Sequence, residues 1–185
     1  MLSYAAVAVQ AAVGIFTAPI FARHLSPLDF SLLGYFNSFS MFLFPLVHLS
    51  LGNYYSIHFF RLDEDQRKRL LYSLLVFLSL FNIVFLCVSY FVLKFYFKAA
   101  NVSFNLHPYV FILLIQLYFN LWFNMLQIHY RMSRRFLQYF FITSAFNIMV
   151  VGIGLLLVVK FNLGAAGRMS GNMSAFIVIS LVSMW

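Results

Sequence analysis

The sequence predicts an all-α protein, a polytopic transmembrane helix bundle of about six spans. Of its 185 residues, 64% are hydrophobic and 21% aromatic, and only 9% are charged. Soluble domains hold about 45–50% apolar and about 25% charged residues, so this composition is typical of a membrane protein. The apolar residues run continuously and do not alternate at period two, which favours helices over the strands of a membrane barrel.

Short polar breaks separate the apolar runs. The breaks are RHLSPLDF (23–30), RLDEDQRKR (61–69), KFYFKAANVSFNLH (94–107), RMSRR (131–135) and KFNLGAAGR (160–168). The spans expected between them, within one lobe covering residues 1–185, are roughly 2–22, 31–60, 70–93, 108–130, 136–159 and 169–185. The first run has no Lys or Arg before its apolar stretch, so we interpret it as a span rather than a secretory signal peptide.

The second and third expected spans have distinctive compositions. The second is longer than a bilayer requires and contains Pro45 and Gly52, which predicts a tilted or kinked helix. The third run, 70–93, is the most apolar along its length, so we expect it to lie toward lipid.

Basic residues in the breaks predict the orientation of the chain. The breaks at 61–69 and 131–135 together hold seven Lys and Arg residues, and the other three breaks hold five. The positive-inside rule therefore favours a cytoplasmic N-terminus. The net charge of +8 is interpreted as a topology signal and a contact to anionic membrane lipid, and no nucleic-acid partner is expected.

Polar side chains recur on one face of the fourth expected span. At about 100° per residue, this face gathers carboxamides and ends in a guanidinium. Its members are Gln116, Asn120, Asn124, Gln127 and Arg131. Such residues can join helices by hydrogen bonds of about 1 kcal/mol each, or they can line a water-filled path. Because the row follows the whole span, we favour a path for a substrate.

The second expected span shows a weaker stripe of small and polar residues. Asn37 and His48 fall on one side of it, together with Gly34 and Ser38. Asn37 is a candidate for the same substrate path. His48 is also a candidate, although we interpret it first as a hydrogen-bonded interior histidine rather than a proton carrier.

The first break has the form of a helix start. Ser26 occupies the cap position, Pro27 the first helical position and Asp29 the third, where a carboxylate favours the helix dipole. Ser26 and Asp29 are therefore predicted to be structural. Arg23, just before them, remains a candidate for substrate contact.

The residue inventory limits the chemistry. No expected span contains Asp or Glu, so we expect a polar cargo, anionic or sugar-bearing, rather than a coupled cation. Carboxamides and hydroxyls suit sugars, and the planar fork of arginine suits phosphate. The sequence has one cysteine, no metal-ligand cluster, no nucleophile paired with a base and no Gly-rich phosphate loop. We therefore expect neither an enzyme nor a cofactor or metal site.

Three stretches in order resemble the Wzx-type polysaccharide flippases of the multidrug/oligosaccharidyl-lipid/polysaccharide exporter superfamily. They are APIFARHLSPLDFSLLGYF, LVHLSLGNYYSIHFFRLDEDQRKRLLYSLL and VVKFNLGAAGRMSGNMSA. The resemblance implies the N-terminal lobe of a two-lobed transporter, with the C-terminal lobe missing from this chain. By position, Arg23 is similar to an arginine that ends the first helix in the lipid II flippase branch.

The resemblance also implies a cargo and a setting. The cargo would be an undecaprenyl-pyrophosphate-linked oligosaccharide, moved across the bacterial inner membrane for lipopolysaccharide O-antigen or capsule. A polysaccharide polymerase and glycosyltransferases would be its partners. Two alternatives stay open: a drug or cation antiporter of the same superfamily, and a non-transporting membrane subunit whose polar stripes are assembly surfaces.

Overall fold

The prediction of an all-helical bundle is confirmed by the computed structural model. It describes the backbone of residues 2–99 and 107–183, and within these ranges it contains helices and no strand. The helices are α1 (Leu2–His24), α2 (Pro27–His48), α3 (Leu51–Phe59), α4 (Glu64–Ala99), α5 (Tyr109–Met132), α6 (Phe136–Leu155) and α7 (Gly164–Ser183). A short π-helix, η1 (Leu156–Lys160), continues α6.

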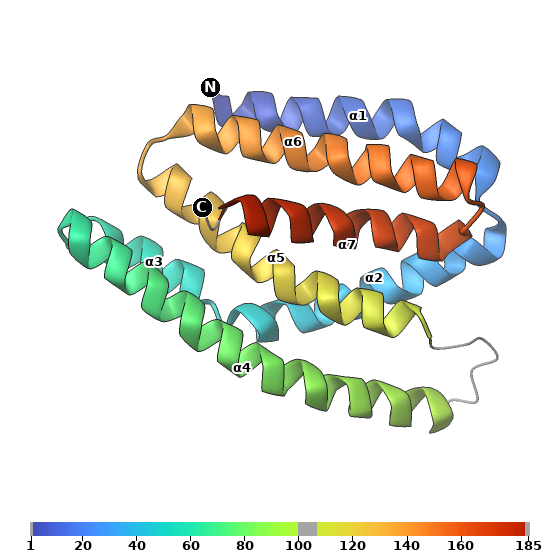
Figure 1. Cartoon of the computed structure of the whole chain (residues 1–185), viewed down its shortest axis with the longest axis horizontal. Helices are drawn as coiled ribbons and strands as arrows, with labels where there is room; N and C mark the ends of the chain where they lie inside the picture. The colour runs from blue at the N-terminus through green and yellow to red at the C-terminus, as the bar shows by residue number, and fades with distance from the viewer. Residues whose placement is uncertain (1, 100–106, 184–185) are drawn as a thin grey trace.

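The long helices run back and forth between two ends of the bundle (Figure 1). Among the described residues, five helices are long and apolar enough to cross a membrane: α2, α4, α5, α6 with η1, and α7. Helix α1, 23 residues long, lies along α6. The breaks at 61–69 and 131–135 meet at one end, and the breaks at 23–30 and 160–168 meet at the other. This alternation fits a membrane-embedded bundle of about six spans.

The second span differs from its prediction, because it is two helices rather than one kinked helix. Helix α2 ends at His48 and α3 begins at Leu51, and the two residues between them have positive φ angles of 46° and 54°. The break leaves the Val47 carbonyl available, and the buried Asn82 side chain of α4 donates to it at 2.9 Å. The amide thus satisfies a backbone oxygen that lipid could not satisfy.

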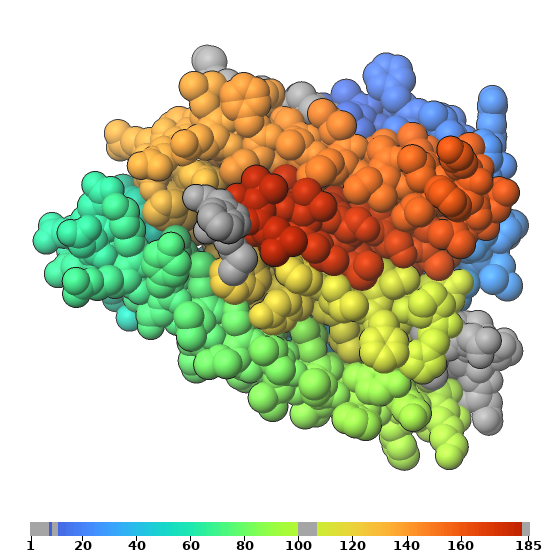
Figure 2. Space-filling model, viewed as in Figure 1, coloured from blue at the N-terminus to red at the C-terminus, as the bar shows by residue number. Residues whose placement is uncertain are grey.

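Helix α5 occupies the centre of the bundle. It contacts α2, α3, α4, α6 and α7, and Leu121 and Met125 on it are fully buried. Helix α7 lies on one face of the molecule between α6 and α5 (Figure 2). Helix α4 lies along the edge of the bundle away from α1 and α6. It exposes large apolar side chains such as Val84 and Phe91, as expected of a helix facing lipid.

Helices α6 and α7 approach each other closely through two glycines. A Cβ atom built on Gly171 would lie 2.6 Å from the Gly154 Cα and 2.7 Å from the Gly154 nitrogen. No side chain fits this gap, so position 171 requires glycine for the helices to pack at this distance. The crossing holds the first half of α7 against α6, next to the polar cavity that Arg168 and Asn172 line.

Candidate functional site

A polar cavity of about 390 Å³ lies between α2, α5 and α7. We call it the interior cavity; it is open on one side, where Phe30 and Asn37 are exposed. Its polar lining consists of Asn37, Ser40, Gln116, Arg168 and Asn172. Its apolar lining comes mainly from α2, with Phe30, Leu33 and Phe36, and from Met169 of α7. The cavity lies toward the end of the bundle where α2 and α7 begin.

Arg168 is the charged residue of this lining. Its guanidinium carbon lies 4.3 Å from the centre of the Phe21 ring, a cation–π contact with α1. Its Nη1 atom is buried, lies next to Gly154 and has no hydrogen-bond partner among the described residues. The missing side chain at Gly154 makes the space for this atom, since a Cβ there would lie 3.0 Å from it.

No carboxylate balances Arg168 in the described structure. The chain has four acidic residues, and three of them lie together at 63–65, at the opposite end of the bundle. The fourth, Asp29, is engaged by backbone and hydroxyl donors and forms no ion pair in the described part of the chain. A cation held inside a bundle without a counter-ion favours an anionic ligand, because burial of an unpaired charge is costly.

The carboxamides of the cavity can recognise a polar ligand. Gln116 of α5 and Asn37 of α2 line it from two sides, and both belong to the predicted substrate path. The Asn172 Oδ1 atom of α7 is buried and has no partner among the described residues. An unsatisfied carbonyl oxygen and an unpaired guanidinium on one helix provide an acceptor next to a donor, which suits a ligand with both hydroxyls and phosphate.

Asp29 holds the start of α7 against the start of α2. The predicted cap is confirmed: the Ser26 amide donates to Asp29 Oδ2 at 2.9 Å, and the Asp29 amide donates to Ser26 Oγ at 3.1 Å. The sequence did not predict the third contact, in which the Ala165 amide donates to Asp29 Oδ1 at 2.8 Å. Gly164 makes this possible, since its φ is 51° and a Cβ on it would lie 2.5 Å from the carboxylate.

Of the other predicted site residues, the two arginines lie outside the interior cavity. Arg23 is exposed at the end of α1, and Arg131 is exposed at the end of α5. His48 is buried, with its Nδ1 atom 2.9 Å from the Phe44 carbonyl and its ring stacked on the Phe44 ring. This geometry agrees with the interpretation of His48 as an interior, hydrogen-bonded histidine.

The predicted row on α5 is divided among different surroundings. Gln116 lines the interior cavity, whereas Gln127 donates to the Thr143 hydroxyl of α6 at 3.1 Å and so joins two helices. Asn120 and Asn124 are half-buried and do not line the cavity. The row therefore contains both of the roles considered for it, a cavity wall and an interhelical contact.

Sequence reasoning missed Arg168 and Asn172 as site residues. Arg168 was counted as a topology signal because it ends the break KFNLGAAGR. The helix begins earlier than expected, at Gly164, which carries Arg168 one turn into the bundle. The sequence signal that could have placed them is Gly164, since a helix that starts there puts positions 168 and 172 on one face.

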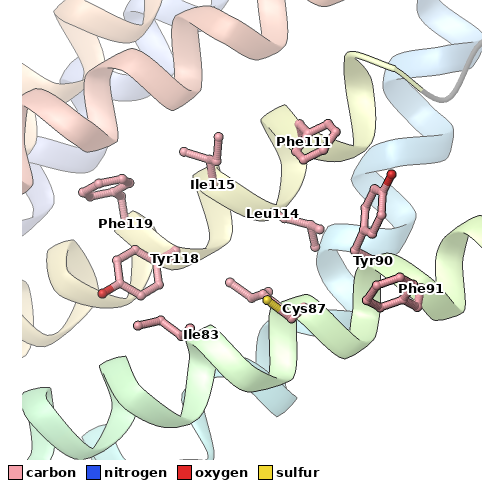
Figure 3. Close-up of a pocket in the computed structure, with 10 residues that line it drawn as sticks. Ile83, Cys87, Tyr90, Phe91, Phe111, Leu114, Ile115, Tyr118 and Phe119 are labelled. Atoms are coloured by element: carbon pink, nitrogen blue, oxygen red, sulfur yellow. The ribbon is translucent and has the colours of Figure 1, made fainter.

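A second, larger cavity is apolar. It measures about 520 Å³ and opens between α4 and α5, and its lining includes Leu114, Ile115 and Phe91 (Figure 3). Cys87 also lines it and is exposed. Its surface suits hydrocarbon, and it offers no charged group for recognition.

Within the described residues, no group of three or more His, Cys, Asp or Glu side chains could hold a metal ion. Comparison with protein-family models, curated proteins and solved structures finds no match. The fold class thus rests on the structure itself, and the membrane-embedded character on the length and apolar composition of five described helices.

Proposed function

We propose that this chain forms a lobe of a membrane transporter that carries a polar, anionic substrate through the interior cavity. The observation that supports the proposal is Arg168, a cation that lines a cavity inside the bundle with no carboxylate beside it. A phosphate or pyrophosphate would supply the missing negative charge and accept hydrogen bonds from the guanidinium fork.

The proposed substrate class is an oligosaccharide linked to a lipid through pyrophosphate. Asn37, Gln116 and Asn172 would hydrogen-bond the sugar hydroxyls, while Arg168 would bind the pyrophosphate. The resemblance of three stretches to polysaccharide flippases supports this class. It also supports a location in the bacterial inner membrane with a cytoplasmic N-terminus, and glycosyltransferases and a polymerase as partners.

The antiporter alternative is disfavoured by the charge of the cavity. A carrier for cations uses carboxylates within the membrane to hold them. The interior cavity has none in its lining and carries an arginine instead, which would repel a cationic drug or a sodium ion.

The test is ligand binding by the full chain in lipid nanodiscs. The probes are a short polyprenyl-pyrophosphoryl disaccharide and, for the antiporter alternative, tetraphenylphosphonium. Arg168→Met should weaken binding of the first probe about tenfold or more, since each charge-assisted hydrogen bond contributes about 1.5–3 kcal/mol. Lys160→Gln is the matched control, because it removes a positive charge from an exposed residue at the same end of the bundle.

Thermal unfolding distinguishes a lost ligand from a lost fold. Arg168→Met should unfold at the same or a higher temperature than the parent, because it removes a half-buried cation whose buried Nη1 atom has no partner among the described residues. The proposal fails if Arg168→Met binds the disaccharide as tightly as the parent does, or if only tetraphenylphosphonium binds.

A further inference from the structure

A third pocket lies at the other end of the bundle, where α4 begins and α5 ends. It measures about 230 Å³, and we call it the basic pocket. Its charged lining consists of Glu64, Arg67, Lys68 and Arg135. Phe59, His129 and Ser133 form the rest of its wall. The interior cavity shares no residue with it.

Three cations from two distant parts of the chain meet in this pocket. Arg67 and Lys68 come from the first turns of α4, and Arg135 follows the end of α5. Glu64 is the one acid of the lining, and it pairs with Lys68 at 3.0 Å. Two arginines therefore remain without a carboxylate partner in the described structure, which leaves a net positive pocket.

The arginine at the wall is held in place before any ligand arrives. The Arg67 guanidinium carbon lies 4.5 Å from the centre of the Phe59 ring, and its Nε atom is buried without a partner among the described residues. His129, beside it, is fixed by a 2.7 Å hydrogen bond between its Nδ1 atom and the Tyr55 hydroxyl. Pre-organised donors bind an anion with less loss of conformational freedom than mobile surface side chains do.

The pocket lies just beyond the apolar stretches of α4 and α5. Its residues stand at the points where two membrane-spanning helices, α4 and α5, enter or leave the apolar region. Phosphate groups of lipids lie at this level, and basic pockets between membrane helices bind anionic headgroups. Phe59 and the Ser133 hydroxyl add an apolar wall and a hydrogen-bonding group to the cations.

We infer that the basic pocket is a binding site for a phosphate group, supplied by the headgroup of an anionic phospholipid in the leaflet at this end of the bundle. Arg67 and Arg135 contact the phosphate oxygens from opposite sides, and Lys68 contributes charge while paired with Glu64. This site is separate from the interior cavity, and its existence does not depend on transport.

The test compares two double variants of the full chain. Arg67→Gln with Arg135→Gln removes the two free arginines of the pocket. Arg69→Gln with Arg134→Gln is the matched control, since it removes the same charge from exposed neighbours that do not line the pocket. The detergent-purified protein is titrated with short-chain phosphatidylglycerol, with phosphatidylcholine and with inorganic phosphate. Binding is read from the shift in unfolding temperature.

The parent should be stabilised by phosphatidylglycerol and much less by phosphatidylcholine. The pocket variant should lose phosphatidylglycerol affinity about tenfold or more. The control should lose about threefold or less, since Arg69 and Arg134 do not line the pocket and the detergent offers them no anionic surface. Stabilisation by inorganic phosphate with the same dependence on the two variants would also support a phosphate site, but with a free phosphate as its source. Equal losses in both variants, or no loss in the pocket variant, would overturn the inference.

One further variant keeps the test decisive. If the pocket double variant fails to fold, Arg135→Gln alone is compared with Arg134→Gln alone, because Arg135 is exposed and its replacement leaves the Arg67–Phe59 contact intact. A loss of affinity confined to Arg135→Gln supports the site. Equal affinity in both single variants overturns it.

Discussion

Arginine serves two different settings in this molecule, the interior cavity and the basic pocket. Arg168 is half-buried, lies over the Phe21 ring, shares its cavity with polar amides and forms no ion pair in the described structure. Arg67 also stacks on a phenylalanine, Phe59, but it shares its pocket with other charges of both signs. The two sites thus use the same aromatic support and differ in how their charge is balanced.

The two settings favour different ligands for the two arginines. In the interior cavity a single half-buried guanidinium without an ion pair acts at short range, so a ligand must bring the balancing charge and fit the cavity. At the end of the bundle, several cations act together on a headgroup and are screened by salt over about 10 Å. We therefore expect salt to weaken binding in the basic pocket more than in the interior cavity.

Closing the gap between α6 and α7 should have the largest effect on the interior cavity alone. Gly171→Ala places a methyl group 2.6 Å from the Gly154 backbone, so the helices must separate. We expect a loss of about 1–3 kcal/mol in the free energy of unfolding. Binding to Arg168 should also weaken, because Gly154 lies beside that guanidinium. Thermal unfolding and disaccharide binding in nanodiscs measure the two effects.

A matched glycine provides the control. Gly152 is on the same helix as Gly154, but a Cβ atom on it would meet nothing within 4 Å. Gly152→Ala should therefore stabilise the protein by about 0.5–1 kcal/mol, because alanine loses less backbone entropy on folding. Equal stability of the two alanine variants would show that the described crossing is not tight.

Removing the charge of Asp29 should have an intermediate effect. Asp29→Asn places an NH₂ group where the Ser26 amide and hydroxyl or the Ala165 amide now donate. We expect a loss of about 1–2 kcal/mol in unfolding free energy, the usual value of a helix cap. Arg168 lies one turn beyond Ala165, so binding in the interior cavity should weaken while the basic pocket is unaffected.

Asp65→Asn is the control for this variant. Asp65 is an exposed acid in the first turn of α4, far from the start of α7. Its replacement should change neither stability nor disaccharide binding. If both variants lose the same stability, general charge effects rather than the contact between α2 and α7 explain the result.

The sequence predicted the bundle because composition and the spacing of breaks depend only on local residues. The cap at Ser26 and Asp29 was predictable for the same reason, since both residues lie within four positions. The contact from Asp29 to Ala165 was not predictable, because it joins residues 136 positions apart and local patterns carry no information on such a contact.

The candidate site was predicted in part. Asn37 and Gln116 were found because helical periodicity places polar residues on an inner face. Arg168 was missed because an arginine next to a break looks like a topology signal until the helix start is known. The same periodicity grouped Gln127 with Gln116, although Gln127 contacts α6, since periodicity gives the face and not the neighbour.

The smallest expected effect tests the balance of charge in the basic pocket. Glu64 is the one acid of its lining, and it pairs with Lys68 in an exposed ion pair. Exposed pairs contribute little to stability, so Glu64→Gln should leave the unfolding temperature unchanged. It should raise phosphatidylglycerol affinity about two- to threefold, because Lys68 then becomes free to contact the phosphate.

Disaccharide binding in the interior cavity is a second measurement on the Glu64→Gln variant. Glu64→Gln adds a net positive charge at the end of the bundle opposite Arg168, so disaccharide binding in the interior cavity should not change. Asp65→Asn again serves as the control, since it adds the same net charge outside the pocket lining. If Asp65→Asn raises phosphatidylglycerol affinity as much as Glu64→Gln does, the lipid responds to surface charge. A rise confined to Glu64→Gln means that the phosphate lies within reach of Lys68.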